Sequence, residues 1–194
     1  MRAKRGFLIR GEAPDLAEFF PQAGEILSLA VAAKRTTLAT AESCTGGLLG
    51  AALTAFTGSS STYLGGVITY SNLAKIRLLG IPEGVIAKWG AISPQVAGAM
   101  AAGVRNLLGS DIGIGVTGIA GPGCSERRPA GLVYVALSSR THTYLTRLSG
   151  DNGRHGNRAA AVVAALDLLQ KELSAVNGPP NREDSSQQHP APGE

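Results

Sequence analysis

The chain has 194 residues, of which 44% are hydrophobic, 5% aromatic and 16% charged, and its formal net charge is +4. These values favour a single domain with a sizeable core and exclude a chain that is disordered throughout. No apolar run reaches the roughly 18 residues that a membrane span requires, because Arg105 and Asp111 interrupt the richest stretch. The basic excess is small and thinly spread and aromatic residues are few, so the composition argues against a nucleic-acid partner.

Cysteine usage and the chain ends bear on compartment and domain limits. Cys44 and Cys124 are too few for a disulfide framework or a zinc site, and we predict no metal and no other cofactor. The N-terminal apolar stretch 6–9 is too short for a secretion signal, so we expect a cytoplasmic protein. We expect a flexible segment at 1–12, a folded domain at 13–176 and a disordered tail at 177–194.

Helix and strand signals alternate between these ends. Apolar spacing and β-prone runs predict, in order, helix 22–34, strand 36–41, helix 47–56, strand 63–70, a helix that begins at Ser93–Pro94, strands 111–117, 132–137 and 143–148, and helix 158–173. The last two strands are predicted to pair across a turn near Arg140. This order predicts an α/β domain with a mixed sheet, because the late hairpin adds an antiparallel pair to helix-connected strands.

The first candidate segment for chemistry, 40–47, lies between a predicted strand and a predicted helix. Its small residues allow a sharp backbone turn, and the N–H groups at a helix start suit an anion, either a phosphate or a developing oxyanion. Ser43 or Cys44 would be the nucleophile. An ordinary helix N-cap with a packing glycine is the equally weighted alternative. The candidate ligand contacts beside the nucleophile are Glu42, Thr45, Gly46 and Gly47.

The second segment holds Tyr70, Asn72 and Lys75 where a strand runs into a short helix. Three such side chains so close in sequence can converge on one site. The alternative is a surface lysine beside a half-buried tyrosine. The pairing with Ser43 favours the functional interpretation, because a serine hydroxyl is a weak nucleophile unless a base takes its proton.

The positions of the histidines help to decide which group takes the proton of Ser43. His189 falls in the predicted tail, and His142 and His155 fall in turn or loop contexts, so a serine–histidine–aspartate triad is poorly supplied. A buried lysine is the alternative base, since burial can lower a lysine pKa toward roughly 7–8. The sequence therefore favours Lys75 over any histidine as the proton acceptor.

The third segment, 113–123, contains a GxGxxG pattern. A dinucleotide fingerprint requires a helix that opens at the third glycine and an acid about 20 residues later. Pro122 and Pro129 forbid that helix, and 137–140 offers no acid. We instead expect a strand that enters a glycine-rich loop whose N–H groups face a ligand, with a plain long turn as the alternative. The candidate contacts in this segment are Thr117, Gly118, Ile119, Ala120 and Gly121.

The fourth segment places Arg154 and Arg158 four residues apart at a helix start, so both lie on one helix face. Such a pair can hold a phosphate or a carboxylate. A solvated charged face is the commoner role for two such arginines.

Three of these segments contain the motifs AESCTGG at 41–47, TYSNLAK at 69–75 and TGIAGP at 117–122. Together, and in this order, they resemble the CinA C-terminal domain family, which includes the stand-alone nicotinamide-nucleotide amidase. The resemblance extends over about residues 22–173. The chain departs from the family pattern in the loop 123–129, which is one residue shorter and has Arg128 in place of a lysine, and at Asn152–Gly153, which are inserted before Arg154.

The resemblance implies a three-layer α/β/α sandwich that forms a homo-oligomer and needs no metal. It also implies an amidohydrolase of pyridine nucleotide salvage that converts nicotinamide mononucleotide to nicotinate mononucleotide and ammonia. The expected partner is therefore a small-molecule nucleotide, with no nucleic acid and no membrane. Ser43 would be the nucleophile, and Lys75 would take its proton directly or through Tyr70. Backbone N–H groups of 44–47 would stabilise the oxyanion, and a helix start or the two arginines would hold the phosphate.

Two other functions were weighed against this one. The alternative is a non-catalytic binding or regulatory module linked to competence or DNA damage, against which the intact Ser43, Tyr70 and Lys75 argue. A short-chain dehydrogenase is disfavoured, because in that class the glycines precede the catalytic residues and the tyrosine and lysine lie four residues apart, whereas here the gap is five.

Overall fold

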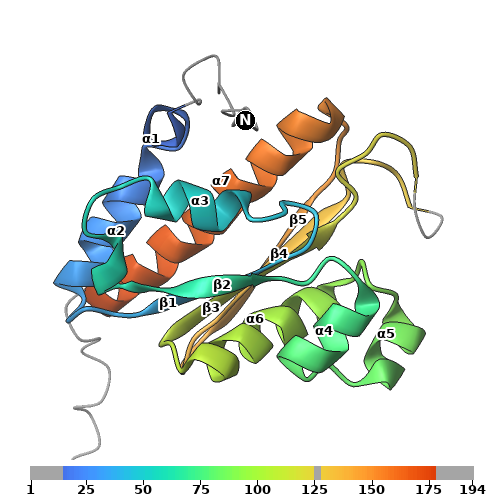
Figure 1. Ribbon diagram of the computed structural model, residues 1–194, viewed down its shortest axis with the longest axis horizontal. Helices are drawn as coiled ribbons and strands as arrows, with labels where there is room; N and C mark the ends of the chain where they lie inside the picture. The colour runs from blue at the N-terminus through green and yellow to red at the C-terminus, as the bar shows by residue number, and fades with distance from the viewer. Residues whose placement is uncertain (1–14, 125–127, 178–194) are drawn as a thin grey trace, which may run out of the picture.

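The computed structural model describes residues 15–124 and 128–177. The segment expected to be flexible, 1–12, lies outside these residues, and so does the expected tail apart from Asn177, which ends the last helix. Figure 1 shows a central sheet between two groups of helices. No helix in the described ranges is both long and apolar enough to cross a membrane.

The sheet has five strands in the order β2-β1-β3-β4-β5. The strand bounds are β1 (Leu38–Glu42), β2 (Tyr63–Ile68), β3 (Ile112–Gly118), β4 (Val133–Ser138) and β5 (Thr143–Leu148). β1 runs parallel to β2 and β3, whereas β4 runs antiparallel to β3 and to β5. The mixed sheet and the late hairpin predicted from the sequence are thus confirmed.

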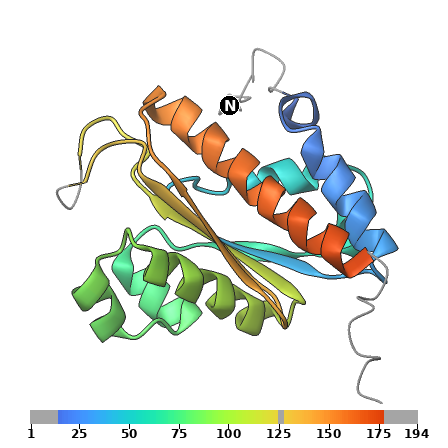
Figure 2. The same cartoon turned by 180° about the vertical axis from the view of Figure 1, so that it is seen from behind.

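Helices cover both faces of this sheet, as Figures 1 and 2 show. The first group is α1 (Leu16–Phe19), α2 (Gln22–Ala32), α3 (Leu48–Thr54) and α7 (Gly153–Asn177), and the second is α4 (Asn72–Leu79), α5 (Glu83–Trp89) and α6 (Pro94–Leu108). A 3-10 turn at Ser59–Ser61 precedes β2. The three-layer α/β/α sandwich that the family resemblance implied is therefore present.

Each face of the sheet buries its own apolar cluster. The larger cluster lies under α2, α3 and α7 and includes Ile26, Leu49, Ile114, Val135, Leu166 and Leu169. The cluster under α4, α5 and α6 includes Ala39, Ile81, Val96, Met100 and Val104. Burial of these side chains from water is the main force that holds the layers together.

The glycines of the GxGxxG pattern lie within β3 and serve packing. A Cβ atom on Gly115 would lie 2.4 Å from the carbonyl oxygen of Ala97 in α6, and one on Gly113 would lie 2.2 Å from that of Ala101. The backbone of α6 therefore approaches β3 more closely than any side chain at these positions would permit. The close packing of α6 on β3 thus explains these glycines, and the pattern is not a dinucleotide fingerprint.

The main differences from the sequence prediction concern helices. α7 begins at Gly153, five residues before the predicted start, so that His155 lies in a helix and not in a loop. The short helices α1 and α5 were not predicted. The predicted start of α6 is confirmed, because Ser93 Oγ accepts a hydrogen bond of 3.2 Å from the N–H of Val96.

Candidate active site

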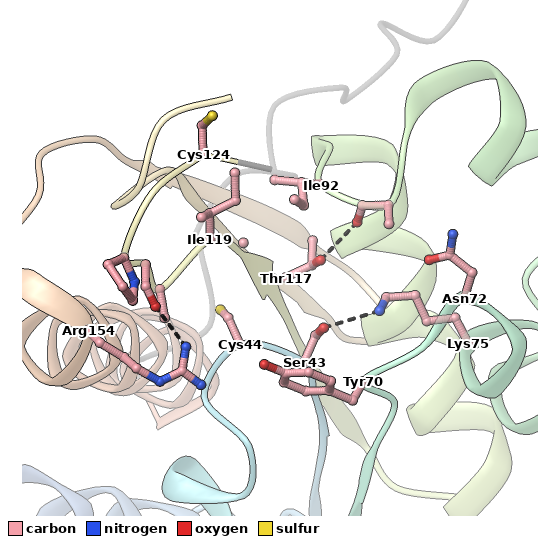
Figure 3. Close-up of a pocket in the computed structure, with 15 residues that line it drawn as sticks. Ser43, Cys44, Tyr70, Asn72, Lys75, Ile92, Thr117, Ile119, Cys124 and Arg154 are labelled. Atoms are coloured by element: carbon pink, nitrogen blue, oxygen red, sulfur yellow. Dashed lines mark hydrogen bonds between the residues drawn. The ribbon is translucent and has the colours of Figure 1, made fainter. Parts of the chain in front are cut away.

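The carboxyl ends of β1, β2 and β3 meet at one edge of the sheet, where ligands of open α/β sheets commonly bind. Glu42, at the end of β1, is in register with Ile68 of β2 and Val116 of β3. A pocket of about 280 Å³ opens there and is drawn in Figure 3. The segments after all three strands contribute to its wall.

Eleven of the sequence-predicted site residues line this pocket: Ser43, Cys44, Tyr70, Asn72, Lys75, Thr117, Gly118, Ile119, Ala120, Gly121 and Arg154. Five others do not: Glu42, Thr45, Gly46, Gly47 and Arg158. Sequence reasoning missed four residues of the wall, namely Ala91, Ile92, Pro122 and Cys124.

Ser43 and Lys75 meet inside the pocket, although 32 positions separate them in the sequence. Lys75 Nζ donates hydrogen bonds to Ser43 Oγ at 3.1 Å and to the carbonyl oxygen of Thr69 at 2.7 Å. The lysine is 1% exposed and the serine 8%. Ser71 caps α4 through a hydrogen bond of 3.1 Å from the N–H of Ala74, and so fixes the helix that carries the lysine. The amine and the hydroxyl are thus within proton-transfer distance.

The backbone around Ser43 explains why this hydroxyl is held in place. The N–H of Ser43 donates to the carbonyl oxygen of Val116 at 2.9 Å, which extends the β1–β3 ladder past the end of β1. The chain then turns through Gly46 and Gly47, whose φ angles of +60° and +94° lie in the region that favours glycine. The serine therefore lies at an anchored position shortly before a tight turn.

Glu42 has a different role from the predicted ligand contact. Its buried carboxylate accepts hydrogen bonds from the N–H groups of Gly47 (2.9 Å), Leu49 (3.2 Å) and Gly50 (2.8 Å). The start of α3 is thus capped by the protein's own anion, which suits the positive end of a helix. The N–H of Gly46 is also engaged, by the carbonyl oxygen of Ser43 at 3.1 Å. The helix start is consequently not an open anion site.

Cys44, the rival nucleophile, is 6% exposed and lines the pocket. Burial raises the pKa of its thiol to about 11, although the N–H groups of Cys44 and Thr45 act in the opposite direction. A thiol with this pKa is protonated at neutral pH and is a poor nucleophile.

The end of β3 and the loop that follows it form another wall of the pocket, and both are tied to the segment around the connection between α5 and α6. Thr117 Oγ1 donates to the carbonyl oxygen of Ala91 at 2.8 Å. The guanidinium of Arg128 donates to the carbonyl oxygens of Ile92 and Trp89. These bonds bring Ala91 and Ile92 to the pocket, a tertiary effect for which the sequence carried no local signal.

The two arginines of α7 have separate environments. Arg154 lines the pocket, and its Nη1 donates to the carbonyl oxygen of Gly121 at 2.8 Å, as Figure 3 shows. Arg158 instead donates to the carbonyl oxygen of Thr45, from Nε at 3.1 Å and from Nη2 at 2.6 Å. Only the first of the pair therefore presents its charge to the pocket.

The family model of the CinA C-terminal domain matches residues 22–173. The chain belongs to this family. A CinA-like protein from Desulfovibrio desulfuricans is 49% identical over 146 residues, which cover 73% of this chain and 34% of that relative. One from Geobacter sulfurreducens is 46% identical over 141 residues, which cover 72% of this chain and 34% of that relative. The chain thus spans about a third of the length of these curated relatives.

Solved structures of the same superfamily share the fold over nearly the whole described chain. The competence/damage inducible protein CihA from Agrobacterium tumefaciens matches with a TM-score of 0.74 and 36% identity, over 88% of this chain and 100% of that one. A CinA superfamily protein from Escherichia coli matches with a TM-score of 0.75 and 30% identity, over 86% and 99% respectively. The α/β sandwich described above is therefore the CinA fold.

The three residues singled out in the CinA motifs all face the pocket of this CinA domain. Tyr70 lines the same pocket as Ser43 and is 64% exposed. No group of three or more histidine, cysteine, aspartate or glutamate side chains suited to a metal ion occurs within residues 15–124 and 128–177. The functional groups that line the pocket include the hydroxyl of Ser43, the amine of Lys75, the phenol of Tyr70 and the guanidinium of Arg154.

Proposed function

We propose that this protein is an amidase that hydrolyses the carboxamide of nicotinamide mononucleotide to nicotinate mononucleotide and ammonia. The observation that carries the proposal is the hydrogen bond of 3.1 Å between Lys75 Nζ and Ser43 Oγ at the pocket wall. A serine paired with a buried base is the arrangement that acyl transfer requires. Membership in the CinA family supports the choice of a nicotinamide nucleotide as substrate.

The first half-reaction acylates Ser43. Burial disfavours the charged form of an amine, so the enclosed Lys75 is suited to act as a base. The amine accepts the hydroxyl proton as Oγ bonds to the carboxamide carbon, and the carbonyl oxygen becomes an oxyanion. The N–H groups of Cys44 and Thr45 stabilise this charge, an effect of roughly 3–4 kcal/mol per donor at comparable sites.

Collapse of this intermediate breaks the carbon–nitrogen bond. The proton held by Lys75 passes to the departing nitrogen, which leaves as ammonia. A water molecule then attacks the Ser43 ester, and one of its protons passes through the same amine to Oγ. The acid that leaves gives its remaining proton to the solvent and becomes the carboxylate product. The direct contact between the amine and the hydroxyl supports proton transfer without a relay through Tyr70.

Arg154 is the residue proposed to contact the phosphate of the substrate. It is the arginine of α7 that lines the pocket, and it lies across the pocket from Lys75 in Figure 3. A guanidinium binds phosphate oxygens through two parallel hydrogen bonds. The phosphorylated nucleotide should therefore be preferred over its nucleoside.

The experiment is an ammonia-release assay with purified protein and nicotinamide mononucleotide, compared with nicotinamide riboside and free nicotinamide. We expect turnover of the nucleotide, weaker turnover of the riboside, and loss of turnover in Ser43→Ala. Cys44→Ala should retain activity, because its thiol is protonated. Activity retained in Ser43→Ala would exclude Ser43 as the nucleophile. Nucleotide binding without ammonia release would instead favour a non-catalytic binding module.

A further inference from the structure

Three side chains near the start of α7 contact the two loops that follow β1 and β3. Arg154, Asn157 and Arg158 follow the i, i+3, i+4 spacing that places side chains on one helix face. The Asn157 amide donates to the carbonyl oxygen of Ala120 at 3.0 Å. With the bonds from Arg154 to Gly121 and from Arg158 to Thr45, α7 holds the loop after β3 and the loop after β1 together.

The contact of Asn157 with Ala120 is buried, whereas those of Arg158 with Thr45 are partly buried. Asn157 is 3% exposed, and it also donates to Asp151 Oδ1 at 2.8 Å and accepts from the N–H of Asn152 at 2.9 Å. Thr45 is fully buried, and its carbonyl oxygen accepts from both donors of Arg158 and, at 3.3 Å, from the N–H of Leu48. Because hydrogen bonds from a charged donor are the stronger kind, the guanidinium contacts favour one position of this loop.

The position of Thr45 close to Ser43 in the chain explains why its contact with Arg158 affects the nucleophile. Thr45 lies two residues after Ser43 and is followed by Gly46 and Gly47, both with positive φ. On its other side, Ser43 is anchored by its N–H bond to Val116. The arginine therefore anchors the far end of a short span that contains the nucleophile and the two proposed oxyanion donors.

We propose that Arg158 and Asn157 are positioning residues that hold the Ser43 loop against the loop after β3, so that Ser43 Oγ stays within reach of Lys75 Nζ. Arg158 does not line the pocket, and its guanidinium is engaged by a backbone carbonyl, so it serves the geometry of the nucleophile and does not bind substrate. The kinetic part of this inference rests on the proposed amidase function.

The kinetic test compares Arg158→Met with Lys171→Met, which removes an exposed cation from the same helix. Because a misplacement of about 1 Å can lower a rate roughly 100-fold, we expect kcat to fall ~10–100-fold in Arg158→Met with little change in KM. Lys171→Met should match the parent protein. A raised KM with unchanged kcat would assign Arg158 to substrate binding and overturn the proposal. If Arg158→Met does not fold, Arg158→Lys provides the same comparison, because it keeps the charge but loses the planar fork.

A second measurement needs no activity. Cys44 lies next to Thr45 and is 6% exposed, so the rate at which a thiol reagent labels it reports opening of this loop. In a Cys124→Ser background, which removes the other cysteine, Arg158→Met should label Cys44 at least tenfold faster than Lys171→Met does. Loss of a cation does not by itself activate a thiol, since nearby cations favour the thiolate.

An unchanged labelling rate in Arg158→Met would overturn the proposed positioning role. Should the parent protein release no ammonia from the nucleotide, the amidase function would fail, and the labelling rates would still decide whether Arg158 holds the loop. The two failures are thus distinguishable.

Discussion

Lys75 is only 1% exposed, and its amine donates hydrogen bonds to the Ser43 hydroxyl and to the Thr69 carbonyl oxygen. If the amine is the base, Lys75→Met should lower kcat by a factor of about 10² to 10⁴, the usual contribution of a positioned base. Methionine fills a similar volume, so the protein should remain folded. Steady-state kinetics and urea unfolding on the same preparation would check both statements. A cooperative unfolding transition with near-normal turnover would contradict the base assignment.

Tyr70 offers a way to separate a proton relay from a simple pocket wall. Because Lys75 contacts Ser43 directly, we expect Tyr70→Phe to retain kcat within about tenfold, whereas loss of a working acid–base group costs at least 10². Tyr70→Ala removes a ring that lines the pocket and should raise KM. Kinetics of the two variants, measured side by side, decide the matter. A drop of 100-fold or more in Tyr70→Phe would restore the relay through the phenol.

At this scale the sequence predicted which residues gather but not every role. Ser43, Tyr70 and Lys75 were predicted together from their motifs and from the shortage of suitable histidines, and all three line the pocket. The cap that Glu42 provides and the reach of Arg158 to Thr45 depend on how loops pack in three dimensions. No local pattern states which carbonyl oxygen a long side chain will meet.

Among the elements, the contact between β3 and α6 makes the sharpest stability prediction. Alanine at position 115 would place a Cβ atom 2.4 Å from the Ala97 carbonyl oxygen, so Gly115→Ala should reduce the free energy of unfolding by about 1–3 kcal/mol. Gly98 in α6 has nothing within 4 Å of its would-be Cβ, so Gly98→Ala should raise it by up to about 1 kcal/mol. Chemical denaturation measures both. If both substitutions changed the free energy of unfolding equally and in the same direction, the close approach of α6 would not be the reason for the glycine at position 115.

The elements that sequence analysis missed have physical reasons as well. α5 has only seven residues and one buried side chain, Ile86, so it gives no sustained apolar period. The first turn of α7 contains Gly153 and Gly156, which have poor helix propensity. Bonds made by Asn157 to the loop after β3 help to hold this turn, which shows tertiary contacts overriding propensity.

Across the whole molecule, the edge of the sheet at the carboxyl ends of β1 and β3 and the opposite edge have different roles. The pocket lies at the carboxyl ends of β1 and β3. His142, one of the histidines considered as a base, lies next to the start of β5, and it contacts Glu172 of α7 at 3.0 Å. Because β4 runs antiparallel to β3, the register of the sheet places the β4–β5 turn at the edge opposite the pocket. The three-dimensional arrangement thus removes this histidine from the site, as its sequence context had suggested.

At that opposite edge, Asp111 ties the starts of the central strands together. Its carboxylate accepts from the N–H and the hydroxyl of Thr37 at 3.0 and 2.8 Å, and Arg140 lies 3.5 Å away. The Thr37 N–H above all, together with the hydroxyl and the arginine, lowers the pKa of this carboxyl below its ordinary value of 3.8. The folded protein therefore favours the ionised carboxylate of Asp111 more than the unfolded chain does. The stability that results is lost as the pH falls below the ordinary pKa of this group and the carboxylate becomes protonated.

Asp111→Asn should consequently lower the free energy of unfolding at neutral pH by about 1 kcal/mol or less, since the side chain is partly exposed and asparagine still accepts a hydrogen bond. The difference from the parent protein should stay constant above about pH 5 and shrink as the solution is made more acidic, because the parent carboxylate is then protonated. Urea unfolding across this pH range measures it, and kcat and KM should be unchanged because the pocket lies at the other edge. A difference that grows toward acid pH would show that the carboxylate destabilises the fold, and a change in kcat would show that the two edges are coupled.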